Sequence, residues 1–166
     1  YSLAIAPRNS SFVSVRSTHA ADGVRSTLPQ IVDGELGSGP IAGIAAAQAA
    51  HPDVAWLAVA CDLPFLSDDT VSHLVARRGV HPVTAYRSAH DGLPEPLCAI
   101  YEPATRAAIV EFIGTGKYCP RKFIIGTGVP LVGLPEPAAL DNVNTPEELA
   151  AAAARLAGQA GPGFRA

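Results

Sequence analysis

The sequence predicts an α/β domain built around a largely parallel sheet, and three observations carry that prediction. Short apolar runs alternate along the chain with segments of helical pattern, which is typical of βαβ units. Apolar residues make up 48% of the 166 residues and charged residues 16%, a balance that suits a buried sheet and argues against disorder. The run at residues 55–61 is continuously apolar, as expected of a central strand covered on both faces.

The first elements expected along the chain are short strands followed by a helix. Residues 1–6 (YSLAIA) fit the end of a helix as well as a strand. Residues 12–16 (FVSVR) are the first clear strand candidate, and Gln30–Val32 is a short second one. Pro40–Ala50 is alanine-rich, and its leading proline suits a helix start because the ring holds φ near the helical value.

The middle of the chain alternates between helix and strand in the same way. After the apolar strand, Ser67 provides an N-cap, and two aspartates provide an acidic first turn, for a helix that runs to about residue 78. Residues 82–87 and 97–101 are the next strand candidates. A long polar loop at residues 88–96 joins them.

The C-terminal third is expected to be mainly helical. Helices are predicted at residues 104–113 and, shorter, at 121–125, before a last strand at 129–134. Thr145, followed by a proline and two glutamates, predicts the N-terminus of a final helix that ends at about residue 156.

Composition and charge narrow the class of protein. The formal net charge is −3 without a basic run, so nucleic acid is not an expected partner. Three scattered cysteines indicate neither a disulfide framework nor a zinc site and fit a reducing cytoplasm. No apolar stretch approaches the roughly 20 residues of a membrane span, and the first residues lack a signal-peptide pattern. We predict one cytoplasmic domain at residues 1–157, with no membrane partner, and a frayed tail at 158–166.

The strongest local signal for a site is Asp62, within the run CDLPFL at residues 61–66. This aspartate ends an apolar strand, so its carboxylate is expected at the carboxyl edge of the sheet, where open α/β sheets bind ligands. A carboxylate at such an edge is a natural ligand for Mg²⁺, which also contacts phosphate oxygens. The alternative is that Asp62 accepts hydrogen bonds from the turn that follows it.

Two further polar segments precede helices. Residues 33–40 (DGELGSGP) combine Asp33 with glycines that permit close backbone approach, and Gly39 lies directly before a helix start that attracts anions. The alternative is a flexible turn with a helix cap. Asn142 and Asn144 alternate on an extended stretch, so both amides are expected on one face, suited to a metal-bound phosphate or a pterin ring. The alternative for them is a set of polar turn residues ahead of a helix.

Positively charged side chains that would suit an anionic ligand occur in two places. The polar loop between the middle strands is a candidate substrate rim, with Arg87 and His90 as its cations. Residues 117–122 contain three cations, among them Arg121 and Lys122, and are a candidate clamp for a phosphate or a pterin phosphate. Solvated loop charge is the alternative. The five histidines lack the spacing of metal ligands.

Four runs, taken in order, carry a family resemblance: GPIAGIAAA, CDLPFL, EPLCAIY and DNVNTPEEL. At these spacings they resemble the molybdenum cofactor guanylyltransferases, of the MobA-like NTP transferase family, over residues 12–156. The resemblance implies a three-layer, doubly wound, Rossmann-like nucleotidyltransferase fold with a mostly parallel sheet. It also implies transfer of GMP from GTP to molybdopterin carrying molybdenum, with Mg²⁺ as cofactor and pyrophosphate as the second product.

The resemblance also assigns roles to residues of this chain. Asp62 matches the metal-binding aspartate, which lies near the nucleotide, and Asp33 matches an acidic residue close to the guanine nucleotide. Asn142 and Asn144 match a pair of asparagines on the substrate side, and Arg121 matches a basic residue that faces the pterin. The implied partners are GTP and molybdopterin, with contact to proteins that deliver molybdopterin or mature molybdoenzymes.

The chain departs from the family pattern in two places. The family's first strand ends in a glycine-rich loop of the form LAGGxSxRMGxDK, which holds the triphosphate, and no such run occurs here. That strand and loop are therefore expected to be missing, and these residues alone are expected to be nearly inactive. Arg16 stands where the family tends to carry an asparagine near the base. Cytidylyl or sugar-phosphate transfer, and a non-catalytic relative that binds a nucleotide or cofactor, stay open as alternatives.

Overall fold

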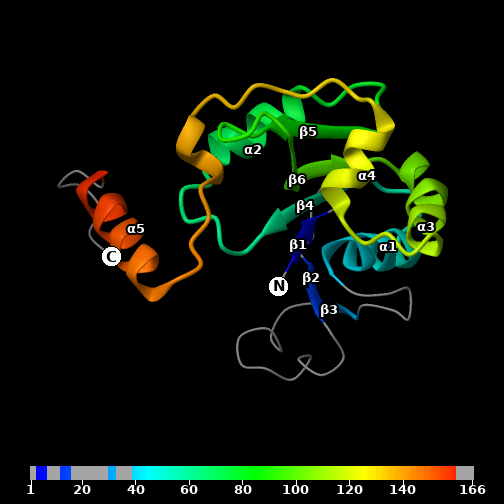
Figure 1. The fold of residues 1–166 in the computed structure, drawn as a ribbon, viewed down its shortest axis with the longest axis horizontal. Helices are drawn as coiled ribbons and strands as arrows, with labels where there is room; N and C mark the ends of the chain where they lie inside the picture. Colours follow the sequence, from blue (N-terminus) through cyan, green and yellow to red (C-terminus); the bar gives the residue numbers. More distant parts are fainter. Residues whose placement is uncertain (1–2, 7–11, 16–29, 33–38, 160–166) are drawn as a thin grey trace.

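The computed structural model describes residues 3–6, 12–15, 30–32 and 39–159 of the chain. In this part of the chain, helices cover both faces of a six-stranded sheet (Figure 1). The strands are β1 (Leu3–Ala6), β2 (Phe12–Val15), β3 (Gln30–Val32), β4 (Trp56–Ala60), β5 (Val83–Arg87) and β6 (Pro94–Tyr101). The α-helices are α1 (Pro40–Ala50), α2 (Asp68–Ala76), α3 (Arg106–Gly114), α4 (Pro120–Thr127) and α5 (Pro146–Gln159). Two short 3₁₀ helices are η3 (Pro103–Thr105) and η4 (Pro137–Leu140).

The sheet has the strand order β3-β2-β1-β4-β6-β5, and its pairing differs from the prediction. Among the described strands, only β2 and β3 pair in parallel, while the other four neighbouring pairs are antiparallel. Strands β2 to β5 still run in one direction, because the two reversed strands, β1 and β6, lie between them. Residues 88–93 connect β5 to β6, and residues 7–11 connect β1 to β2; both are too short for the crossover that a parallel pair needs. The α/β class is confirmed, and the expectation of parallel neighbours is corrected.

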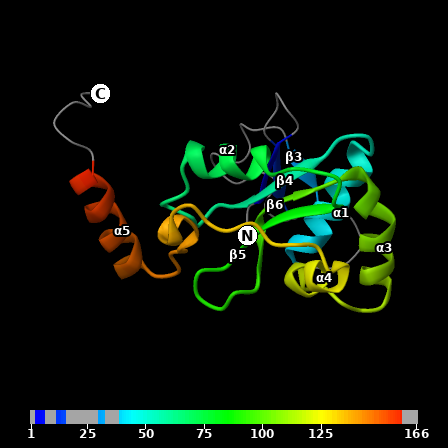
Figure 2. The same ribbon diagram turned by 90° about the horizontal axis from the view of Figure 1, so that it is seen from above.

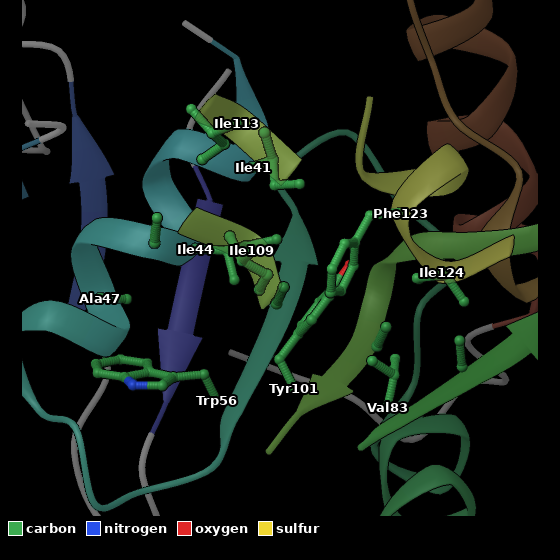
Figure 3. Close-up of a cluster of buried hydrophobic side chains, with 14 residues drawn as sticks. Ile41, Ile44, Ala47, Trp56, Val83, Tyr101, Ile109, Ile113, Phe123 and Ile124 are labelled. Atoms are coloured by element: carbon green, nitrogen blue, oxygen red, sulfur yellow. The ribbon is translucent and has the colours of Figure 1, made fainter. Parts of the chain in front are cut away.

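Two apolar clusters place the helices on opposite faces of the sheet, giving the three layers that were predicted. The larger cluster joins α1, α3 and α4 to one face and includes Ile44, Trp56, Ile109 and Phe123 (Figure 3). The second joins α2 to the other face through side chains such as Leu74 (Figure 2). Alternate residues of β4 and β6 face the two clusters, as the two-residue period of a strand requires.

The other elements follow the prediction, apart from an earlier start of β6 at Pro94 and a strand at residues 129–134 that does not form. Residues 1–6 fitted a helix end as well as a strand, and the structure has β1 at Leu3–Ala6. Residues 129–134 do not form a strand: only Val132 pairs, in an isolated parallel bridge to Tyr86. Pro130 lies within this stretch and Pro135 follows it, and a proline has no N–H to donate to a ladder. The stretch is apolar as predicted, but its prolines limit the strand pairing to a single bridge.

Helix α5 stands apart from the layered part of the structure (Figures 1 and 2). Of its described side chains, only Ala152 is buried. The domain assignment at residues 1–157 and the frayed tail at 158–166 stay predictions, and the helix itself continues to Gln159. Within the described residues, none of the helices has both the length and the apolar character needed to cross a bilayer.

Candidate functional site

Asp62 lies just beyond the end of β4, where the chain turns away from the sheet. Leu63 and Leu66 stabilise this turn by packing against the second apolar cluster, and Leu66 N donates to Leu63 O at 3.3 Å. The Asp62 side chain is half-buried, and no described residue forms a hydrogen bond or an ion pair with its carboxylate. Its own turn, which was the alternative partner, therefore leaves the carboxylate available to a ligand.

The asparagine stretch lies against the turn that carries Asp62. Val143 N donates to the main-chain oxygen of Asp62 at 3.0 Å, which joins two segments far apart in the sequence. Asn142 and Asn144, on either side of Val143, both line the pocket that Asp62 lines. Both asparagines thus lie at the same pocket as the Asp62 carboxylate, and their binding role stays a prediction.

A capping box fixes the backbone directly after these asparagines. Thr145 Oγ1 accepts from Glu148 N at 3.2 Å, as expected for an N-cap residue. In return, one carboxylate oxygen of Glu148 accepts from Asn144 N at 2.7 Å and from Thr145 N at 3.1 Å. The start of α5 thus holds Asn144 by its main chain, which leaves the side-chain amide free to face the pocket.

These segments meet at a pocket of about 380 Å³. That volume falls within the range of small-molecule sites, roughly 300–1,000 Å³. The walls come from the end of β4, the β5–β6 connection, the first half of β6, the start of α4 and the asparagine stretch. The polar lining residues are Asp62, Ser88, His90, Asp91, Glu95, Arg121, Asn142 and Asn144.

Arg121 is the member of the cationic stretch that reaches this pocket. It follows Pro120 at the start of α4, and two carboxylates contact its guanidinium. Nη1 donates to Asp91 Oδ2 at 2.7 Å, and Nη2 lies 3.4 Å from Glu95 Oε2. Lys122, which we had grouped with Arg121, is exposed and does not line the pocket.

The loop between β5 and β6 forms part of the rim, as predicted, through His90 rather than Arg87. His90 Nε2 lies 2.9 Å from Asp141 Oδ1, next to the asparagine stretch. Arg87 is exposed outside the pocket, and its Nη1 lies 3.4 Å from Gly92 O. Sequence reasoning missed Asp91, which lies in this same loop.

Glu95 was missed as well, because the predicted loop extended to residue 96 whereas β6 begins at Pro94. The signal that would have drawn attention to both acids is charge complementarity between this loop and the cationic stretch at residues 117–122.

Two nucleotide-site predictions lie on the glycine-rich turn before α1. Asp33 lies outside the described residues. Gly39 is described, and it precedes α1 with φ of +89°, a conformation that L side chains rarely adopt. Nothing lies within 4 Å of a Cβ built there, so the backbone, rather than crowding, calls for glycine. Gly39 is not among the residues that line the described pocket.

Local hydrogen bonds and burial set the protonation of two pocket residues. The hydrogen bond from Leu93 N, with help from the Arg121 guanidinium, holds the pKa of Asp91 below its ordinary value. Asp91 is therefore a carboxylate at neutral pH. Burial, with a smaller contribution from the charge of Glu95, raises the pKa of the Cys98 thiol to about 12. Cys98 thus lines the pocket as a neutral and unreactive thiol.

The donor set of the pocket fits Mg²⁺ better than a softer metal. Among the described residues, no three His, Cys, Asp or Glu side chains come together as metal ligands. Asp62 instead offers one unpartnered carboxylate, and the two asparagines offer amide oxygens in the same pocket. Magnesium commonly takes one or two protein carboxylates and completes its shell with water and substrate phosphates, whereas a structural zinc site takes four protein ligands.

Comparison with known proteins gives a family match and related sequences. Residues 4–127 match the family model of the MobA-like NTP transferase domain. A Synechocystis molybdenum cofactor biosynthesis bifunctional protein is 31% identical over 82% of this chain and 40% of its own length. A probable molybdenum cofactor guanylyltransferase of Trichormus variabilis is 32% identical over 68% of this chain and 55% of its own length. The chain thus spans about half the length of the curated relatives it matches.

Solved structures show the same fold. The molybdopterin-guanine dinucleotide biosynthesis protein A of Archaeoglobus fulgidus superposes with a TM-score of 0.70 at 22% identity. That match covers 89% of this chain and 78% of the other. The nucleotidyltransferase-like, Rossmann-like α/β fold expected from the sequence is therefore confirmed. The family match ends at residue 127, so the place of the asparagine stretch in the site rests on the geometry described above.

Proposed function

This chain belongs to the MobA-like NTP transferase domain family, and we propose that it transfers GMP from GTP to molybdopterin carrying molybdenum. The products are the guanine dinucleotide form of the cofactor and pyrophosphate. The relatives named as molybdenum cofactor guanylyltransferases support this choice of substrates. We place the reaction in the cytoplasm, with contacts to proteins that deliver molybdopterin or receive the finished cofactor.

The observation that carries the proposal is the tether between Asp62 and the asparagine stretch. A hydrogen bond from Val143 N to Asp62 O brings a carboxylate and two amides into one pocket, and Arg121 faces the same pocket from α4. Phosphoryl transfer asks little covalent chemistry of a protein, and the main requirements are positioning and charge neutralisation. An unpartnered carboxylate, two amides and a guanidinium are suited to both tasks.

The reaction forms one bond and breaks one. A phosphate oxygen of the acceptor attacks the α-phosphorus of GTP in line, and the bond from that phosphorus to the pyrophosphate oxygen breaks. Asp62 would hold Mg²⁺, which when bound neutralises charge on the nucleotide phosphates. The two asparagines hold the acceptor side through their amides, and Arg121 pairs with an acceptor anion. Asp33 and the backbone at Gly39 serve the nucleotide side.

Nucleotide binding by the full-length protein tests this proposal first. Calorimetry with Mg²⁺ compares GTP, CTP, ATP and UTP, and a clear preference for GTP is expected. A preference for CTP would move the assignment to cytidylyl transfer, and binding of none of the four would favour a non-catalytic relative.

The role of Asp62 has its own test, carried out in the full-length protein, because residues 1–166 alone are expected to be nearly inactive. Asp62→Ala should abolish turnover, whereas Asp53→Ala, at an exposed aspartate in the turn before β4, should leave turnover unchanged. Normal turnover in Asp62→Ala would show that the metal assignment is wrong.

A further inference from the structure

The loop between β5 and β6, residues 88–93, contacts two walls of the pocket through two adjacent side chains. His90 Nε2 lies 2.9 Å from Asp141 Oδ1, at the start of the asparagine stretch. Asp91 Oδ2 accepts from Arg121 Nη1 at 2.7 Å, at the start of α4. One short loop therefore links two walls that are distant from each other in the sequence.

The loop is held in one shape by its own hydrogen bonds. Ser88 N donates to Leu93 O at 2.8 Å, and Gly92 N donates to Ser88 O at 3.1 Å. Leu93 N donates to the second carboxylate oxygen of Asp91 at 3.0 Å. Gly92 adopts a φ of +72°, which a residue with a side chain would resist. The loop that carries both contacts is therefore braced by hydrogen bonds of its own.

Each wall also has a second anchor, so the loop adds to contacts that already exist. Arg121 approaches Glu95 of β6 at 3.4 Å, and β6 is the strand into which the loop leads. The asparagine stretch is bound to the Asp62 turn by Val143 N. These anchors keep each wall in place locally, and the loop adds a direct connection between the two walls.

We propose that residues 88–93 form a strap that sets the position of Arg121 relative to Asn142 and Asn144, with His90 and Asp91 as positioning residues. This inference rests on the proposed function, because these three groups are the ones that would hold the acceptor. A ligand that contacts both walls binds well only when the walls are held at the productive separation.

Amide exchange on the full chain without substrate tests the strap directly. The amides of Val143, Asn144 and Thr145 are all hydrogen-bonded, so their exchange reports how firmly the asparagine stretch is held. Asp91→Asn cuts the strap from α4 without altering a contact of that stretch. We expect amide exchange in the asparagine stretch to become about two- to fivefold faster, which corresponds to the free energy that an exposed ion pair contributes.

The matched control for this exchange experiment is Asp53→Asn, at an exposed aspartate outside the pocket, which should leave the three amides unchanged. Unchanged exchange in Asp91→Asn as well would overturn the strap, because the contact at α4 would then have no influence on the asparagine stretch.

Turnover in a double-mutant cycle provides an independent test. His90→Ala and Asp91→Asn should each raise KM for molybdenum-molybdopterin about two- to fivefold while kcat stays nearly constant. The KM of the double variant should be no higher than that of the single variant with the larger increase, because a strap cut at one end no longer links the walls. Additive effects would mean two independent local contacts and would refute the strap. His81→Ala, an exposed histidine outside the pocket, is the control.

The strap and the proposed function fail in different ways. Normal turnover in Asp62→Ala would refute the metal role of Asp62, and binding of no nucleotide would refute the proposed function; the exchange experiment would still decide on the strap in either case, since it needs no activity. If Asp62→Ala loses turnover while Asp91→Asn changes neither exchange nor KM, the strap alone is wrong.

Discussion

Replacing Glu148 by alanine should loosen the start of α5 and the asparagine beside it. The Glu148 carboxylate accepts from the backbone N–H groups of Asn144 and Thr145, and the substitution removes both hydrogen bonds. Alanine is at least as good a helix former as glutamate, so a loss of stability would come from the cap and not from propensity.

The size of the effect follows from the isolation of the helix. Of the described side chains of α5, only Ala152 is buried, so packing contributes little to hold this 14-residue helix together. Helices of about 12–15 residues are marginal in water without packing. Loss of a capping interaction costs about 1 kcal/mol. Since about 1.4 kcal/mol corresponds to a factor of ten, amide exchange at the start of α5 should become about fivefold faster.

Amide exchange measured by mass spectrometry checks this expectation, with Glu147→Ala as the matched control. Glu147 lies in the same first turn and carries the same charge, so both variants lose the same interaction with the helix dipole. Only Glu148 accepts the backbone donors at residues 144 and 145. Equal acceleration in the two variants would attribute the effect to the dipole and refute the capping argument.

Three further outcomes are expected in the native protein. Cys98 should resist an aromatic disulfide reagent until the chain unfolds, because it is buried and its pKa is raised to about 12, whereas the two exposed cysteines react at once. Ile44→Ala should lower the free energy of unfolding by about 2–5 kcal/mol in urea titrations, while Val80→Ala, at a side chain 98% exposed, should change it by less than about 0.5 kcal/mol. The pKa of Asp91 is depressed in the folded state, so the charged carboxylate stabilises the fold above the unfolded-state pKa of about 4. This stabilisation is lost as the pH falls below that value. Asp91→Asn should therefore reduce the change in melting temperature between pH 6 and pH 3.

Local signals in the sequence predicted the helices well because the interactions that begin them are local. Ser67 caps α2 by accepting from Thr70 N, and Thr145 caps α5 through Glu148 N, each within three residues. The strand at residues 129–134 was predicted wrongly because its apolar pattern is also local, whereas pairing depends on a partner strand and on the prolines that interrupt it.

The candidate site was predictable where one residue carried its own signal. Asp62 was singled out because it ends an apolar strand, and the structure places it at the pocket, where its metal role stays a prediction. The carboxylates around Arg121 were not predicted, since Asp91 and Glu95 meet the guanidinium only after β6, η3 and α3 have folded between them and α4. Which member of a cationic stretch faces a pocket is decided by the fold, as the outward position of Lys122 shows.

The hydrogen bond from Val143 to Asp62 also determines when the pocket can exist during folding. It closes a loop that contains α2, β5, β6, α3 and α4, so the entropy of closing that loop must be offset by packing of the elements inside it. Contacts of such long sequence separation tend to form late. A chain emerging from the ribosome would therefore build its sheet first, and Asp62 would meet the asparagines only after residue 143 has been synthesised. Partly made chains would carry the Asp62 carboxylate without the two asparagines beside it.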